Sequence, residues 1–162
     1  MDINIIDFII IVIIITCIWI GFRRGFGKSI FDFAAVLAAL KISATSNAAV
    51  ASYVPILGDK QANESLIFVL SFLTLGGVFW FIGKTVYDTI VFSLDSLDPP
   101  LGSAVGFAIA IIISHVLVNS FYLAASIKGV APDIIARSTL GFEFFEFPAY
   151  HTIMNVLFHL GE

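Results

Sequence analysis

The residues best suited to chemistry in this chain are three histidines, one cysteine and scattered serines, and their spacing limits what they can do. Ser103 and His115 resemble a serine–histidine pair, but one helix would hold them about 18 Å apart. His151 and His159 share a helical face, yet they would lie roughly 12 Å apart, too far to ligate one zinc ion. Cys17 stands in an apolar run that disfavours its thiolate. We therefore expect no catalytic residue, no metal site and no cofactor, and the chain is not predicted to be an enzyme.

The composition indicates a chain that must position these residues inside a membrane. Hydrophobic residues make up 59% of the 162 residues, charged residues only 12%, and the mean hydropathy is +1.04. A soluble core cannot absorb so much apolar surface, so lipid is the expected partner. The net charge of −4 is spread thinly and offers no basic surface for phosphate contacts. Nucleic acid is therefore excluded as a partner.

Four long apolar runs predict an all-α polytopic membrane protein. Residues 1–125 should form a four-helix transmembrane domain, and residues 126–162 a C-terminal interfacial amphipathic segment. A polar, turn-rich stretch separates the second run from the third, and Pro99 and Pro100 separate the third from the fourth. The predicted helices cover residues 3–22, 29–54, 65–92 and 101–125.

The second run leaves two arrangements open because it carries Lys41 near its middle. A lysine at the centre of a membrane costs about 2.5–3.5 kcal/mol on insertion scales. Either the segment 29–54 spans with Lys41 facing the bundle or a wet cavity, or it breaks near residues 43–47 and then re-enters the membrane or lies in the interface.

Other polar and small residues predict helix contacts. His115, Asn119 and Tyr122 share one face of the fourth helix, where they would either bond neighbouring helices or line a proton or solute path. Small residues at i+4 spacing allow close helix approach. The expected packing residues are Gly76, Gly77 and Gly83 in the third helix and Gly102, Gly106 and Ala110 in the fourth.

The C-terminal segment is rich in aromatic residues and breaks its helices often. Phe142, Phe144, Phe145, Phe147 and Tyr150 are typical of an aromatic belt at a membrane surface. Residues 151–160 predict a short amphipathic helix lying on that surface.

Two stretches carry a family resemblance. The stretch Gly21-Phe22-Arg23-Arg24-Gly25-Phe26, with Lys28, resembles the G-F-R-R-G-F-x-[KR] signature of the colicin V production (CvpA) family. The stretch from Leu97 to Gly106 resembles that family's L-D-x-x-L-G-x-x-F-G motif. The resemblance implies a multi-pass bacterial inner-membrane protein linked to colicin V production or export and to envelope physiology. The family often has an arginine near Ile109 and Ala110, so a role tied to that arginine is not expected here.

If all four helices span, the stretches 23–28 and 93–100 emerge on the same face. We expect a charged collar there, in which Arg23, Arg24 and Lys28 face Asp95 and Asp98, with Asp32 and Asp88 nearby. The count of basic residues is nearly balanced, with Arg23, Arg24, Lys28 and Lys84 on this side and Lys60, Lys128 and Arg137 on the other. The density of basic residues in the short first loop favours a cytoplasmic collar.

Two functions follow from this arrangement. The first is a non-catalytic membrane component that acts through helix packing and contacts with copies of itself or other membrane proteins. The alternative is a small oligomeric transporter or channel with a polar path using Lys41, His115 and Asn119.

Overall fold

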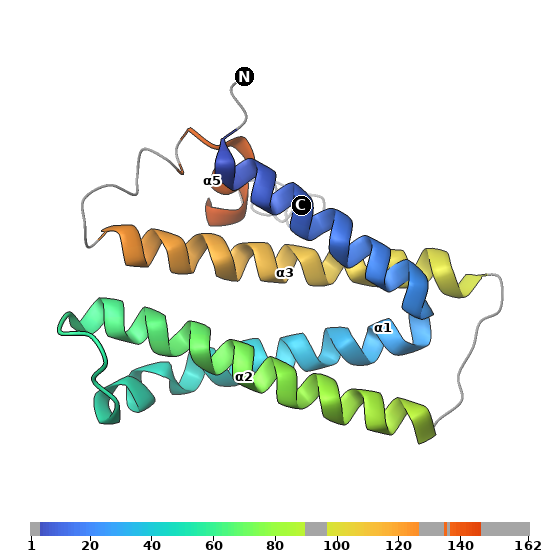
Figure 1. Cartoon of the computed structure of the whole chain (residues 1–162), viewed down its shortest axis with the longest axis horizontal. Coiled ribbons are helices and arrows are strands. Elements are labelled where there is room, and N and C mark those ends of the chain that lie inside the picture. Colours follow the sequence, from blue (N-terminus) through green and yellow to red (C-terminus); the bar gives the residue numbers. More distant parts are fainter. Residues whose placement is uncertain (1–3, 90–96, 127–134, 136, 147–162) are drawn as a thin grey trace, which may run out of the picture.

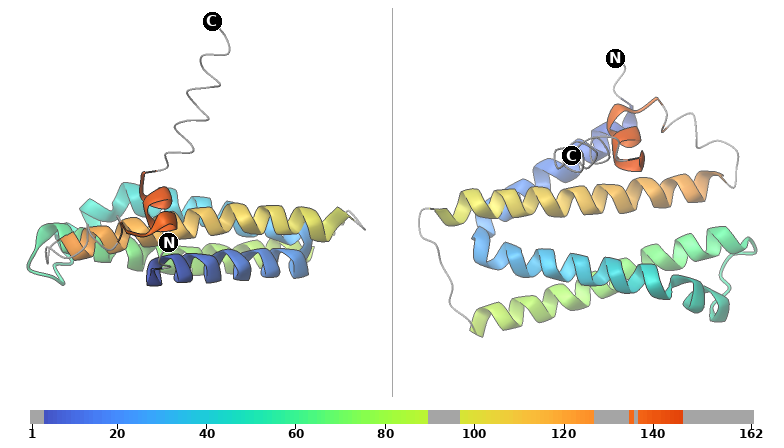
Figure 2. Two further views of the ribbon diagram at one scale, coloured as in Figure 1. Left: turned by 90° about the horizontal axis from the view of Figure 1, so that it is seen from above. Right: turned by 180° about the vertical axis from the view of Figure 1, so that it is seen from behind.

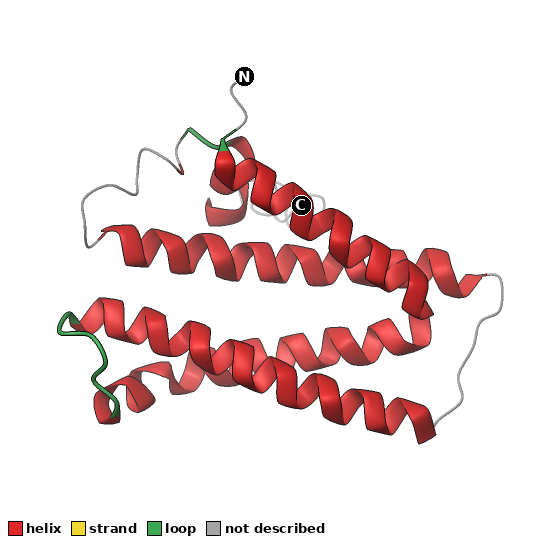
Figure 3. Cartoon of the chain, viewed as in Figure 1, coloured by secondary structure: helices red, strands yellow, loops and turns green. Residues whose placement is uncertain are grey.

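The computed structural model describes residues 4–89, 97–126, 135 and 137–146, and every regular element among them is a helix (Figure 3). The helices are α1 (Ile5–Tyr53), α2 (Lys60–Thr89), α3 (Asp98–Ser126) and α5 (Thr139–Glu146). Of these, α1, α2 and α3 are long and apolar enough to cross a membrane. The all-α prediction for a membrane protein is confirmed. The predicted helix over residues 151–160 lies outside the described residues.

Helix α1 reverses its direction at a single residue. Gly25 has φ 77° and ψ 172°, and the other residues of this 49-residue helix keep helical geometry. The break divides α1 into a first arm, residues 5–24, and a second arm, residues 26–53, that runs back across the molecule (Figure 1). The two arms correspond to the first two predicted helices. The stretch 23–28 is therefore helix interrupted at one glycine.

The helices are arranged around α1. Both α2 and α3 pack along α1, and they contact each other much less than either contacts α1. The turn at Gly25, the start of α3 and the last turns of α2 lie toward one end of the molecule, at the right of Figure 1. We call this the Gly25 end. The link between α1 and α2 lies at the opposite end.

The first arm of α1 and α3 cross at the Gly25 end and diverge from there (Figures 1 and 2). Helix α5 lies between them where they are widely separated. A buried cluster of Ile6 and Ile10 from the first arm, Val118 from α3, and Ile135 and Phe144 fills this space. Residues 139–146 of the C-terminal segment are thus part of the helical core.

The outer surface of the helices is strongly apolar. Side chains such as Ile15, Trp19, Leu73 and Phe81 are each more than 60% exposed in the single chain. Exposed apolar surface on this scale is unfavourable in water but is the normal surface of a helix in lipid. The surface therefore supports the membrane assignment independently of the length of the helices.

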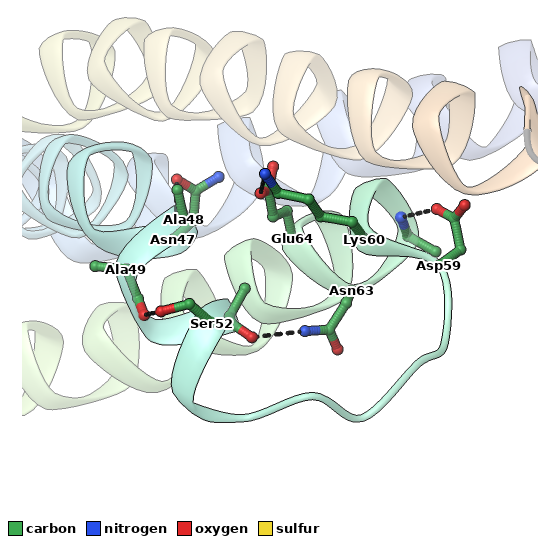
Figure 4. Close-up of polar contacts among 10 residues, drawn as sticks. Asn47, Ala48, Ala49, Ser52, Asp59, Lys60, Asn63 and Glu64 are labelled. Carbon is green, nitrogen blue, oxygen red and sulfur yellow. Dashed lines mark hydrogen bonds and ion pairs between the residues drawn. The ribbon is translucent and has the colours of Figure 1, made fainter.

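Asn63 organises the end opposite Gly25 (Figure 4). Its buried side chain donates to two backbone carbonyls near the end of α1 and accepts the backbone N–H groups of Ile56 and Leu57 at 2.8 and 3.0 Å. Asp59 accepts the N–H of Ala62 at 2.9 Å and caps α2. Because of this cap, α2 begins at Lys60, earlier than the position 65 expected from hydropathy.

Candidate functional site

The site begins where the first arm of α1 crosses α3 at the Gly25 end. Two pairs of glycines, Gly21 with Gly25 on α1 and Gly102 with Gly106 on α3, face each other there. A Cβ on Gly21 would collide with the carbonyl oxygen of Gly102, and one on Gly102 would lie 2.7 Å from the carbonyl carbon of Gly25. Ala110, one turn beyond Gly106, is fully buried. The two backbones are therefore in direct contact, which only glycine permits.

Asp98 joins the start of α3 to the break in α1. Its Oδ1 accepts the backbone N–H groups of Phe26 at 3.0 Å and of Gly27 at 3.4 Å. These are the first amides of the second arm, and the first amides of a helix are those that a side-chain acceptor can cap. A carboxylate at this position also interacts favourably with the helix dipole. The acidic residue that the sequence places opposite the arginines thus binds backbone amides, while Asp95 lies outside the described residues.

Four cations surround this junction, and each lies over an aromatic ring. Arg24 also forms an ion pair with Asp32, with 3.2 Å between Nε and Oδ2. The rings hold the long cationic side chains along the protein surface and leave their charged ends near water. The pairs are Arg23 with Trp19 at 5.7 Å, Arg24 with Trp80 at 5.5 Å, Lys28 with Tyr87 at 5.3 Å and Lys84 with Trp80 at 5.9 Å, each measured to the ring centroid.

These side chains line a cleft of about 310 Å³, which we call the basic cleft; it contains all four cations, Asp32 and the rings of Trp80 and Tyr87. Next to it is an apolar cavity of about 370 Å³ between α1, α2 and α3. Arg24, Asp32 and Trp80 line both spaces, so the two are contiguous.

The sequence identified the cations of this site but not its aromatic residues. Trp19 precedes Arg23 by four residues and Trp80 precedes Lys84 by four, so each pair shares a helix face. That spacing could have predicted two of the ring contacts. The contact of Arg24 with Trp80 and that of Lys28 with Tyr87 join α1 to α2 and depend on the fold.

The polar residues predicted within the membrane lie in two different places. His115 Nδ1 is 2.8 Å from the carbonyl oxygen of Phe144, and Asn119 donates to the His115 carbonyl at 3.0 Å. Tyr122 packs against the apolar cluster beside α5. Lys41 has an exposed side chain on the second arm of α1. The structure therefore brings His115 and Asn119 together near α5 and places Lys41 on the outer surface.

The three glycines of α2 have different surroundings. A Cβ on Gly83 would lie 3.5 Å from the Cβ of Phe31, and one on Gly76 would lie 3.9 Å from the Cβ of Ala39. Both are ordinary contacts with the second arm of α1. Gly77 has open space around the position of a Cβ. Gly76 and Gly83 thus lie toward α1, whereas Gly77 faces outward.

The described part of the chain contains no group of three side chains that could hold a metal ion. The Ser103 hydroxyl donates to the Pro99 carbonyl at 3.1 Å, within its own helix. Cys17 is a half-buried thiol beside the apolar cavity. The geometry that the described residues show is that of helix contacts and of a cationic cleft.

The glycine crossing, the Asp98 cap and the basic cleft all use the two stretches that carry the family resemblance. No curated protein and no solved structure shows significant similarity to the chain. A family model described as colicin V production protein matches residues 6–145, which is most of the chain. The chain therefore belongs to the colicin V production protein family.

Proposed function

We propose that this protein is a non-catalytic component of the bacterial inner membrane that supports colicin V production or export and envelope maintenance. It acts by holding a fixed arrangement of membrane helices and by contacting partner membrane proteins or further copies of itself. The family membership supports the system in which it works. The distribution of polar residues supports the mode of action.

The position of Lys41 relative to His115 and Asn119 is the observation that carries this proposal. A polar path through one copy of the protein would require these side chains to line a common space. His115 and Asn119 instead lie beside α5, where His115 bonds the backbone of Phe144. Lys41 is exposed on the second arm of α1, where a neighbouring protein can cover it. The arrangement favours lateral contacts between proteins over conduction through a single chain.

In the proposed membrane arrangement, both arms of α1 span, giving four spans with α2 and α3. The Gly25 end lies in the cytoplasm, because it carries Arg23, Arg24, Lys28 and Lys84. The two termini then lie outside. Apart from α5, which packs into the helical core, the C-terminal segment 126–162 contributes an interfacial amphipathic surface for partner contacts.

Lys41→Met tests the proposed function against the transporter alternative. The variant removes a charge that costs about 2.5–3.5 kcal/mol at the centre of a span, so it should be at least as stable as the original chain. In bacterial cells whose own protein of the colicin V production family has been deleted, we expect the variant to support colicin V secretion as well as the unchanged chain does. Lys60→Met, in the exposed first turn of α2, is the matched control.

Flux measurements on the same proteins complete the test. Vesicles containing either the original chain or Lys41→Met should conduct protons and small ions no faster than empty vesicles. The transporter alternative gains support if the original chain conducts and Lys41→Met abolishes both conduction and secretion.

A further inference from the structure

Among the described residues, the basic cleft carries more positive than negative charge. Four cations and one carboxylate of that part of the chain line it, and the carboxylate, Asp32, pairs with Arg24. Within the described residues, Arg23, Lys28 and Lys84 contact aromatic rings and form no ion pair with an acidic side chain. Their charges converge on one open space, which makes the cleft suitable for an anion.

The chemistry of the donors favours a phosphate group. An arginine guanidinium presents parallel N–H groups that match phosphate oxygens, and lysine adds a mobile point charge. The cleft combines two residues of each kind. Trp80 and Tyr87 form part of its wall, and such rings are typical of the level of lipid headgroups.

The space behind the cleft is apolar. The adjoining cavity is lined by Cys17, Ile20 and Val36 of α1 and by Ile109 and Ile113 of α3, with Gly76 of α2. Because the helices continue from the Gly25 end into the bundle, this cavity lies deeper in the membrane than the cations. Each of the two spaces has the volume of a small ligand site.

A cationic cleft at the surface that opens into an apolar cavity is complementary to an amphiphilic anion. We propose that this site binds an anionic membrane lipid, with its phosphate group between the four cations and one acyl chain in the apolar cavity. A free phosphate would use the cleft alone and leave the cavity without a role. Lipid binding therefore accounts for both spaces, and it does not depend on which export system the protein serves.

Trp80 provides a direct probe, because it borders both spaces and the chain contains only one other tryptophan, Trp19. In Trp19→Phe, the fluorescence therefore reports on Trp80 alone. The protein, purified in a non-ionic detergent, is titrated with phosphatidylglycerol carrying brominated acyl chains, which quench a tryptophan that they contact. Brominated phosphatidylcholine with the same chains is the zwitterionic reference.

We expect saturable quenching by the anionic lipid and only weak, non-saturating quenching by the zwitterionic lipid. Replacing Arg23, Lys28 and Lys84 with glutamine should weaken apparent binding about tenfold or more. Lys60→Gln, which removes one charge at the opposite end, should leave binding unchanged. Equal quenching by the two lipids, or an equal loss in Lys60→Gln, would overturn the proposal.

A second pair of variants tests the acyl chain. Gly76→Leu should fill the apolar cavity and weaken lipid binding, whereas Gly77→Leu adds the same side chain toward open space and should not. Size-exclusion profiles check that both variants fold. Inorganic phosphate is the remaining arm. If phosphate binds in the cleft while brominated phosphatidylglycerol quenches no better than brominated phosphatidylcholine, the site takes soluble phosphate and the lipid proposal is wrong.

Discussion

Gly25 meets two independent demands at once. Its φ of 77° lies in the left-handed region that glycine adopts without strain and other residues adopt at a cost. A Cβ at this position would also collide with the carboxylate of Asp98. That carboxylate caps the second arm through Phe26 and Gly27. The glycine is therefore needed both for the reversal of α1 and for the bond that fixes it.

Gly25→Ala should consequently destabilise the protein by about 2–3 kcal/mol, from backbone strain together with a disturbed helix cap. Thermal unfolding in detergent, followed by size-exclusion chromatography, measures the loss. Gly77→Ala is the matched control, because it adds the same methyl group in open space on α2. Equal melting temperatures for the two variants would contradict this account.

At the junction of Gly25 and Asp98, the sequence predicts which residues take part better than it predicts which atoms they contact. The charges near Gly25 and Asp98 were visible, and opposite charges were expected to pair. What the sequence does not show is that α1 changes direction at Gly25 and that the backbone amides just after this break bind the Asp98 carboxylate. The glycines at positions 102 and 106 were predicted to form a helix contact, but their partners Gly21 and Gly25 could be assigned only from the fold.

At the scale of elements, α5 shows how a polar residue near one terminus fixes a distant helix. Asp7 of α1 accepts the Ser138 hydroxyl at 2.7 Å and the N–H of Leu140 at 2.8 Å. Ser138 in turn accepts the N–H of Gly141 at 2.8 Å. Together they cap α5 and attach it to the start of α1. Hydropathy indicates an apolar segment here but not this attachment, since the bonding residues are 131 positions apart.

Asp7→Ala should release α5 from the first arm of α1. The change leaves the Ser138 hydroxyl and the Leu140 amide without their buried acceptor, at a cost of about 2–3 kcal/mol. Hydrogen exchange, read by mass spectrometry, should become faster over residues 139–146. Asp59→Ala removes the cap of α2 at the other end and should leave exchange in α5 unchanged. Unchanged protection of α5 in Asp7→Ala would show that the apolar cluster alone holds it.

For the whole molecule, the decisive feature is that α1 changes direction at Gly25, so that its two arms run in opposite directions. Apolar run lengths predicted the helices, because each run satisfies its own backbone hydrogen bonds in lipid. They could not predict that α1 would pack against both α2 and α3 while those two contact each other little. That choice of neighbours depends on which small residues face each other, as at Gly21 and Gly102. The arrangement creates the space in which the basic cleft and the apolar cavity meet.

Cysteine labelling can establish how this arrangement sits in the membrane. In a Cys17→Ala background, which has no other cysteine, single cysteines are placed at Ile5, Leu57 and Leu97, three exposed positions. If both arms of α1 span, Ile5 and Leu57 lie on one side and Leu97 on the other. With a cytoplasmic Gly25 end, a membrane-impermeant maleimide should label positions 5 and 57 in intact spheroplasts, and position 97 only after lysis. Labelling of positions 5 and 57 from opposite sides would mean that α1 crosses once, and labelling of position 97 alone in intact spheroplasts would reverse the orientation.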